Sequence, residues 1–181
     1  MYTSQKIKSL TEKKIKSLTE KEIQSLSLEQ IRALAPWQIR LFTSDQISWF
    51  RPSQITNFTK IQIQTFTKEQ ISWFTPSQIA QFTSDQISWF EWWQIQALTK
   101  NQIQSFSHAD ISSFTSDQIS WFRPSQIVEF TKNQIQSFTE EQIQAFTIEQ
   151  IPYFTPEQIP HLHQNKFIFL QQNNEKFLRE K

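Results

Sequence analysis

Residues that could perform catalysis or bind a metal ion are sparse in this chain. Histidine occurs three times, as His108, His161 and His163. The last two form a His-x-His pair, but two imidazoles without a nearby cysteine or carboxylate are a weak signal for zinc. Asp110 follows His108 closely, and an acid there is explained by the N-terminus of a helix. No histidine lies at a spacing that would activate a serine or threonine, so we predict no catalytic, metal-binding or cofactor-binding residue.

Composition removes further classes of function. The 181 residues include no cysteine and no glycine, which excludes disulfide frameworks, thiolate nucleophiles and glycine loops that cradle phosphates. The formal net charge of +1 gives no general attraction to nucleic acid or anionic membrane. No stretch approaches the ~18 apolar residues of a membrane span, and the start has no apolar signal region. We therefore expect no cofactor, no membrane insertion, and a protein that is cytoplasmic or delivered into a host cell without a classical signal peptide.

Tryptophan and arginine are better candidates, because they concentrate binding energy at interfaces. Tryptophan occurs seven times, and four copies precede a phenylalanine in a recurring Trp-Phe pair. Two of these pairs are followed by an arginine, which could stack on a tryptophan or grip a carboxylate or phosphate of a partner. The tryptophans could equally shield the core between repeats. The candidate partner-binding residues are Trp49, Arg51, Trp73, Trp89, Trp92, Trp93, Trp121 and Arg123.

These residues lie on a tandem repeat of eight residues, Thr-x-x-Gln-Ile-x-x-Phe. Residues 3–162 form 20 consecutive octads without insertion or deletion. The fifth position is isoleucine in all 20, and the eighth is phenylalanine or leucine throughout. A period this strict indicates a repeat architecture, in which each unit buries its apolar face against its neighbours.

Each octad has the pattern of a helix start. Thr or Ser suits the N-cap, and a Gln three residues later can accept a hydrogen bond from the backbone of the cap, which together make a capping box. The apolar residue before the cap and the Ile four residues after it have the spacing of a hydrophobic staple. Five of the seven prolines directly follow the cap position, where a missing N–H costs nothing. We predict an all-α solenoid of about 20 very short capped helices.

Two other structures for the same pattern are disfavoured by geometry. A continuous helix would drift by about 80° per octad, so its apolar stripe would wind around the rod. A β-solenoid would place Ile and Phe, three residues apart, on opposite faces and would need turns without glycine. Trp-Phe-x-Pro segments begin at residues 49, 73 and 121, at intervals of 24 and 48 residues. These intervals favour three octads per coil, although Trp89 does not fit them.

The ends of the array differ from its middle, as expected for coils that have a neighbour on one side only. The first octads use leucine in place of phenylalanine and are rich in lysine. We predict one solenoid domain over residues 1–170, made of regular octads over 3–162 and a degenerate capping octad over 163–170. Residues 171–181 are expected to form a polar C-terminal helix or tail.

The octads that begin at Thr75 and Thr155 open with Thr-Pro-Ser-Gln-Ile and Thr-Pro-Glu-Gln-Ile. They resemble the tandem octapeptide arrays of some bacterial proteins, a family without a settled activity, and the resemblance covers residues 3–162. The phrase Phe-Thr-Pro-Glu-Gln-Ile from Phe154 is also similar to the opening of each repeat in bacterial TAL effectors, which read DNA one base per repeat. Those repeats are several times longer and carry a glycine-bearing base-reading loop, so the similarity implies a shared helix start and little about DNA.

Because nearly every recurring residue is explained by folding, function is expected at the variable outer positions. The sequence favours a non-enzymatic repeat scaffold that binds another protein through these positions. A second hypothesis is nucleic-acid binding through the lysine-rich first octads with tryptophan stacking, which predicts an affinity that falls steeply with salt. A third is a purely structural spacer, in which length matters and surface chemistry does not.

Overall fold

The computed structural model describes residues 3–162, and each octad in this range forms one short helix. Eighteen α-helices of four to six residues are followed by two 3-10 helices, and the described range contains no strand. The all-α solenoid predicted from the octads is thereby confirmed. The helices are α1 (Ser4–Lys8), α2 (Glu12–Lys16), α3 (Glu20–Gln24), α4 (Leu28–Arg32), α5 (Pro36–Ile39), α6 (Ser44–Ser48), α7 (Pro52–Ile55), α8 (Lys60–Thr65), α9 (Lys68–Trp73), α10 (Pro76–Ile79), α11 (Ser84–Ser88), α12 (Trp92–Ile95), α13 (Lys100–Ser105), α14 (His108–Ser113), α15 (Ser116–Trp121), α16 (Pro124–Ile127), α17 (Lys132–Ser137), α18 (Glu140–Gln144), η1 (Ile151–Tyr153) and η2 (Ile159–His161).

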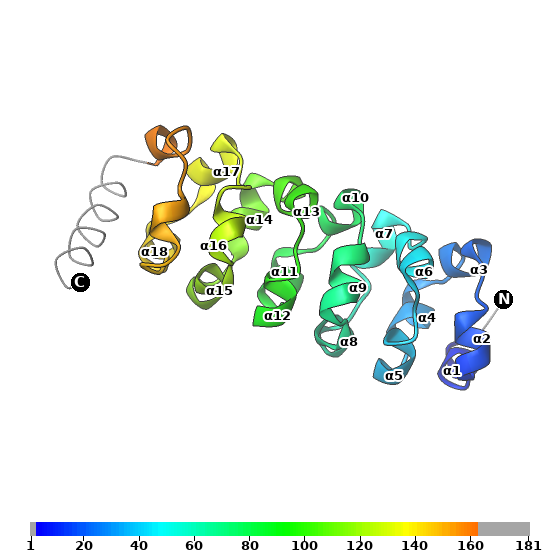
Figure 1. Ribbon diagram of the computed structural model, residues 1–181. Helices are drawn as coiled ribbons and strands as arrows, with labels where there is room; N and C mark the ends of the chain where they lie inside the picture. Colours follow the sequence, from blue (N-terminus) through cyan, green and yellow to red (C-terminus); the bar gives the residue numbers. More distant parts are fainter. Residues whose placement is uncertain (1–2, 163–181) are drawn as a thin grey trace.

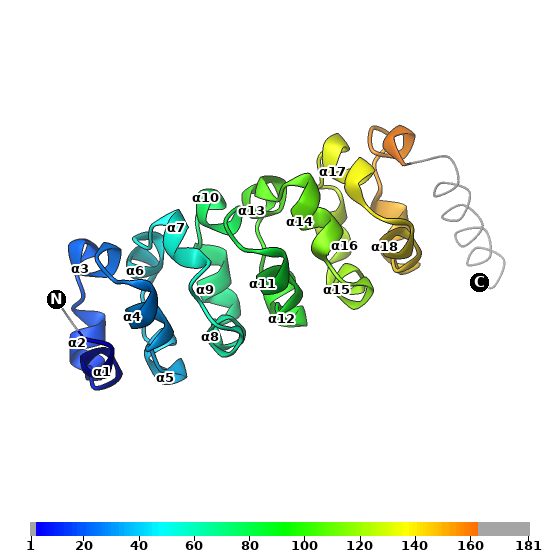
Figure 2. The same cartoon turned by 180° about the vertical axis from the view of Figure 1, so that it is seen from behind.

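The helices wind as successive coils along one axis, from α1–α3 at one end to α18 near the other (Figures 1 and 2). Helices three apart contact each other repeatedly, as α10 does with α13 and α11 with α14. In both views α5, α8, α12 and α15 form one long edge, while α7, α10 and α17 lie along the opposite edge. The capping octad expected over 163–170 and the tail expected over 171–181 lie outside the described residues.

Each helix begins with hydrogen bonds across its own first turn. At α6, the Thr43 hydroxyl accepts a hydrogen bond from the Gln46 N–H at 3.3 Å, and Gln46 Oε1 accepts one from the Thr43 N–H at 3.2 Å. Four octads have no hydroxyl at the cap and lose the first bond, but their glutamine keeps the second. The glutamine therefore holds the start of a helix even without a capping hydroxyl. The four cap residues are Ala35, Arg51, Glu91 and Arg123.

The backbone explains how the chain folds without glycine. The cap Thr43 is extended, with φ −79° and ψ 170°, and Trp49 at the end of the same helix stays in the right-handed helical region, with φ −77° and ψ −16°. No residue in the described range has a positive φ. Because every junction uses conformations that are open to any L-residue, no position requires glycine.

The isoleucine and the phenylalanine of each octad form one continuous core. Every fifth-position isoleucine from Ile7 to Ile143 is at most 1% exposed. The phenylalanines of successive octads pack edge to face in two runs, from Phe42 to Phe90 and from Phe106 to Phe154, with ring centroids 5.0–5.7 Å apart. This geometry adds attraction between rings to the burial of apolar surface.

The repeated glutamine has a second role, which joins each coil to the one before it. In fifteen octads, from Gln38 to Gln158, Nε2 donates to two backbone carbonyl oxygens, one 31 residues earlier at 2.7–3.0 Å and one 28 residues earlier at 2.6–3.1 Å. Oε1 of the same side chain accepts from the cap N–H at 2.8–3.2 Å. Because one partner is a donor and the other two are acceptors, the amide fits in one orientation only. We call these inter-coil bonds the glutamine ladder.

The glutamine ladder sets the size of a coil. Each ladder glutamine bonds to carbonyl oxygens of residues 28 and 31 positions before it, as Gln38 does with Leu10 and Ile7. Outside the ladder, Gln104 Nε2 donates to the carbonyl oxygen of Glu129, 25 residues later. Three octads span 24 residues and four span 32. One coil therefore takes between three and four octads, which refines the value of three that the sequence favours.

Asp110 is the one residue in the run from Gln30 to Gln158 that replaces the repeated glutamine. Its Oδ2 accepts from the Ser107 N–H at 2.7 Å, so it performs the capping half of the role. A carboxylate has no proton to donate, so the ladder bonds that would fall on the carbonyls of Ile79 and Phe82 in this register are missing. The ladder therefore has a gap between α10 and α14.

Replacing Asp110 with glutamine should close this gap and raise the free energy of unfolding by about 1–2 kcal/mol, because two buried hydrogen bonds form. Denaturation with urea measures the change. Asp110→Asn is the matched control, since its shorter amide keeps the capping acceptor without reaching the preceding coil. Equal stability of the glutamine and asparagine variants would contradict the role given to the ladder.

Proline accounts for the change of helix type in the last two octads. Pro152 and Pro160 follow the isoleucine of their octads, at a position that thirteen of the eighteen α-helices include. Because proline has no N–H, it cannot bond to the carbonyl four residues earlier. The chain forms the 3-10 helices η1 and η2 there instead.

Candidate interaction surface

Most of the recurring residues are buried and stabilise the fold. The isoleucines and phenylalanines lie in the core, and the ladder glutamines are buried as well. The side chains left for contact with other molecules are those at the remaining octad positions, which vary most along the sequence. A binding surface must therefore be assembled from residues of different octads that the coils bring together.

Residues 28 apart lie on the same side of neighbouring coils, because the glutamine ladder joins positions 28 and 31 apart. Trp37, Thr65, Trp93 and Trp121 are separated by 28 residues each. Thr65 and Trp93 line one surface hollow, in agreement with this register. The register thus places three tryptophans and a threonine along one line that crosses four coils.

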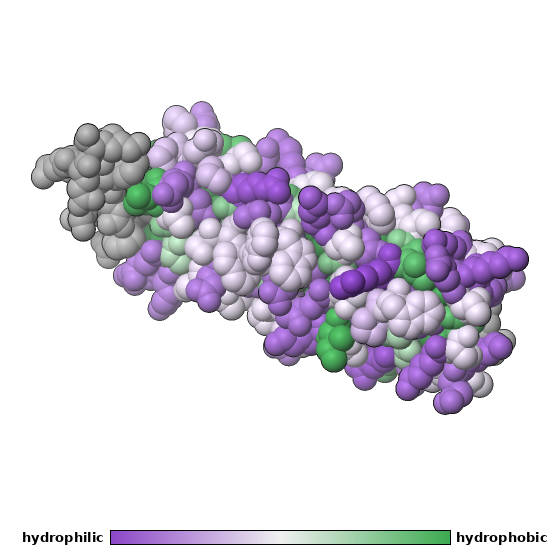
Figure 3. All heavy atoms as spheres, turned by 60° about the horizontal axis from the view of Figure 1, so that its bottom comes forward, coloured by the Kyte–Doolittle hydropathy of each residue, from purple (hydrophilic) through white to green (hydrophobic). Residues whose placement is uncertain are grey.

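This line follows the edge formed by α5, α8, α12 and α15. Trp37 is 49% exposed, Ile61 67% and Trp92 52%. Trp93 and Trp121 are half-buried on this line, and the half-buried Trp89 lies 28 residues after Ile61. Trp92 packs edge to face on Trp93 with centroids 5.8 Å apart. Figure 3 views the molecule toward this edge, where pale and green side chains lie between purple ones. We call it the tryptophan edge, made of Trp37, Ile61, Trp89, Trp92, Trp93 and Trp121.

A hollow of about 400 Å³ opens on the tryptophan edge between α5, α8–α9 and α12. Trp93 and Phe66 give it apolar walls, and Arg40 and Lys68 give it positive charge. Polar groups complete the lining. We call it the Trp93 hollow, and it is lined by Arg40, Gln64, Thr65, Phe66, Thr67, Lys68, Glu69 and Trp93.

Glu69 supplies one negative charge at the rim of the Trp93 hollow. Hydrogen bonding to its own backbone N–H, and then to the Thr67 hydroxyl, lowers the pKa of Glu69 below its usual value, so the carboxylate stays ionised. Lys68 Nζ lies 3.7 Å from Glu69 Oε1, and both side chains are more than half exposed. A pair this exposed holds its partners weakly, so both charges remain available to a ligand.

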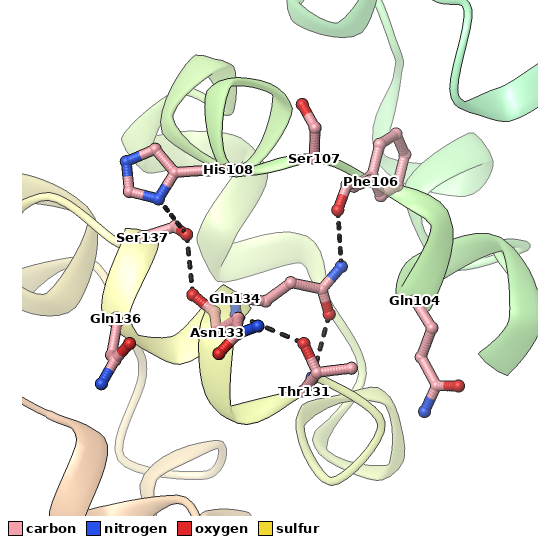
Figure 4. Close-up of a pocket in the computed structure, with 9 residues that line it drawn as sticks. All are labelled: Gln104, Phe106, Ser107, His108, Thr131, Asn133, Gln134, Gln136 and Ser137. Atoms are coloured by element: carbon pink, nitrogen blue, oxygen red, sulfur yellow. Dashed lines mark hydrogen bonds between the residues drawn. The ribbon is translucent and has the colours of Figure 1, made fainter.

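A second hollow of about 520 Å³ lies between α13–α14 and α17 (Figure 4). Here His108 Nδ1 lies 2.6 Å from Ser137 Oγ, and Ser137 Oγ also donates to the Asn133 carbonyl oxygen at 2.8 Å. A serine hydroxyl has a single proton, so both bonds form together only when His108 Nδ1 is protonated and donates. Ser112 Oγ adds a bond to the Ser137 carbonyl oxygen at 3.0 Å. These bonds tie α14 to α17 and leave the Ser137 hydroxyl engaged as a donor.

The structure separates the predicted site residues into two groups. Trp89, Trp92, Trp93 and Trp121 lie on the tryptophan edge, and the exposed Arg123 follows Trp121 there. The other group is the half-buried Trp49, the exposed Arg51 and the 37% exposed Trp73. These three residues lie where the chain approaches α7 and α10, on the opposite edge (Figure 1). Within the described residues neither Arg51 nor Arg123 forms an ion pair.

Five residues of the surface are absent from the candidates chosen by sequence. Trp37 and Ile61 were not among those candidates, and Arg40, Lys60 and Lys68 resemble any solvated charge. The signal that could have found them is the 28-residue interval, which is invisible in an eight-residue frame because 28 is not a multiple of eight.

Within residues 3–162 no group of three or more His, Asp or Glu side chains is placed to hold a metal ion, and His163 of the His-x-His pair lies outside this range. The helices of the same range do not reach the length and apolar character of a membrane span.

The fold and its surface define a class of protein, a solenoid of octapeptide helices with an aromatic edge. No protein-family model fits the chain, and no curated protein is significantly similar to it.

Proposed function

We propose that the protein is a non-enzymatic scaffold that binds a partner protein along the tryptophan edge. The observation that carries the proposal is the exposure of Trp37, Ile61 and Trp92 on one edge of the rod. Large apolar side chains that gather on a surface and are rimmed by polar residues are typical of interaction sites. Tryptophan in particular contributes much of the binding energy of interfaces.

The dimensions of the edge suit an extended segment of a partner. Packed helices lie about 8–10 Å apart, so Trp37 and Trp93, two coils apart, are separated by roughly 16–20 Å along the axis. An extended chain advances about 3.3–3.6 Å per residue, so a segment of roughly five or six residues connects the two positions. A rigid row of coils presents such a line without rearrangement.

Nucleic-acid binding through the first octads is the weaker alternative. Two of the lysines there are held by glutamates, Lys14 by Glu22 at 2.8 Å and Lys16 by Glu12 at 2.6 Å. The first tryptophan of the chain is Trp37, so the lysine-rich first octads contain no tryptophan for base stacking. A spacer function, in turn, gives no reason for exposed tryptophan on one edge.

Selection from a random peptide library on the immobilised chain tests the proposal. We expect enriched peptides to bind the double variant Ile61→Ala, Trp92→Ala at least about tenfold more weakly than the unmodified chain, because tryptophan anchors dominate interfaces. Affinities are measured by fluorescence anisotropy.

The matched control is Trp73→Ala, Val128→Ala, which also removes one tryptophan and one exposed aliphatic side chain, 37% and 41% exposed. It should bind the selected peptides as the unmodified chain does. Circular dichroism verifies that both variants stay folded. Failure to enrich any peptide, or equal losses in the two double variants, would refute binding at the tryptophan edge and favour the spacer.

A further inference from the structure

Four cations surround the N-terminal part of the tryptophan edge. Arg32 and Lys60 are 28 residues apart, and so are Arg40 and Lys68. The register therefore stacks each pair on neighbouring coils, with Trp37 between the two arginines in sequence. All four side chains are exposed. The result is a positively charged frame around an apolar strip, in a chain whose formal net charge is only +1.

The charges of this frame are only weakly compensated by the protein itself. Within the described residues neither Arg40 nor Lys60 forms an ion pair. Lys68 meets Glu69 only at 3.7 Å, with both side chains exposed. Glu91, the next acid along the edge, accepts a hydrogen bond from Gln64 at 2.6 Å. The frame therefore keeps the capacity to bind carboxylates from another molecule.

The Trp93 hollow offers both apolar and electrostatic contacts to a ligand. Its apolar lining comes from the half-buried Trp93 and from Phe66, which is 1% exposed, and its cations are Arg40 and Lys68, which lie on neighbouring coils. A side chain such as leucine fits the apolar walls, while neighbouring carboxylates reach the cations, with the planar guanidinium able to bind one in a bidentate manner. No single charge or ring provides this combination.

We infer that the partner of the tryptophan edge is an acidic, extended peptide segment, whose carboxylates bind Arg40 and Lys68 and whose apolar side chain enters the Trp93 hollow. This inference rests on the proposed function and adds the chemistry of the partner. Exposed charge pairs contribute little each, so the apolar contacts supply affinity while the cations select acidic segments and speed their association.

Three features favour a peptide over a nucleic acid at this place. Ile61, the most exposed apolar side chain of the edge at 67%, offers no stacking surface for a base. Glu69 and Glu91 lie beside the cations and would repel consecutive phosphates. A nucleic-acid footprint also requires a longer continuous basic stripe than two pairs of cations.

The test measures binding of three fluorescent probes to the full chain by anisotropy. The probes are a short peptide rich in glutamate and leucine, its twin with glutamine in place of every glutamate, and a thymidine oligonucleotide. We expect the glutamate peptide to bind about tenfold more tightly than its twin and to weaken as salt is raised. The variant Lys60→Gln, Lys68→Gln should lose about fivefold in affinity for it.

The control variant Lys100→Gln, Lys132→Gln removes the same charge from the same octad position, the second, in α13 and α17. These helices lie along the edge opposite α12 and α15 (Figures 1 and 2). It should bind the glutamate peptide as the unmodified chain does. Equal binding of the twin peptides, equal losses in the two lysine variants, no binding of the glutamate peptide, or tighter binding of the oligonucleotide would each overturn the inference. Library peptides that depend on Ile61 and Trp92 but not on Lys60 and Lys68 would do the same while leaving the proposed function intact.

Discussion

Replacing Gln86 with leucine should lower the free energy of unfolding by about 3–5 kcal/mol, because three buried polar groups lose their partner at once. Gln86 Nε2 donates to the carbonyl oxygens of Ile55 at 3.0 Å and Phe58 at 2.9 Å, and Oε1 accepts from the Thr83 N–H at 3.1 Å. Leucine has a similar volume, so the loss reports hydrogen bonding and not a cavity. Urea denaturation followed by circular dichroism measures it.

Gln81→Leu is the control for this change. Gln81 lies in the preceding octad and is exposed, so its replacement should alter stability by less than about 0.5 kcal/mol. If the free energy of unfolding of Gln86→Leu were within about 1 kcal/mol of that of the unmodified chain, the glutamine ladder would not be a source of the stability of the stacked coils.

The glutamine shows what an octad can and cannot reveal. Gln86 stands three residues after Thr83, and that spacing predicts the acceptor role of its oxygen at the cap. Because capping already explains the glutamine at this position, the sequence pattern gives no sign of the hydrogen bonds that its amide nitrogen donates. Its partners lie 28 and 31 residues away, and they become neighbours only when the chain has coiled. A carboxylate would serve the cap equally well, and the ladder gives a reason for glutamine that capping alone does not.

The short helix formed by each octad was therefore predictable from the sequence, whereas the number of octads per coil was less so. Helix starts, helix ends and the buried faces follow from residues within one octad, such as Thr43, Gln46 and Ile47. The number of octads per coil depends on how phenylalanine rings and glutamine amides of different coils meet, and no local spacing encodes it. The recurrence of Trp-Phe-x-Pro segments favours three octads per coil, and the ladder places the value between three and four.

The candidate surface was predictable in composition but not in arrangement. Trp49, Trp73, Trp89 and Trp121 share an octad position, which suggests one ridge. With between three and four octads per coil, residues at the same octad position fall on different sides of the rod. Trp121 accordingly joins Trp93 on the tryptophan edge, whereas Trp49 lies toward the opposite edge. Equivalence within the repeat and proximity in space are separate properties in this solenoid.

Replacing Phe122 with alanine should cost about 3–5 kcal/mol, because a large buried side chain leaves a cavity that rigid neighbours cannot fill. Phe122 is 2% exposed and packs edge to face against Phe114 and Phe130, with centroids 5.3 and 5.2 Å away. Phe122→Leu should cost less than half as much, since leucine occupies the same octad position at Leu98 and is 4% exposed there. Denaturation by urea measures both changes.

The location of the destabilised residues in Phe122→Ala distinguishes a solenoid from a single globular core. Each coil contacts only its neighbours, so stability is close to a sum of local terms. Amide hydrogen exchange of Phe122→Ala should therefore show lost protection in α14 to α17 before any change in α1 to α6. Trp73→Ala removes an aromatic side chain that is 37% exposed and should leave exchange in both regions unchanged. Uniform loss of protection along the rod in Phe122→Ala would instead indicate a single cooperative unit, whose coils cannot open one at a time.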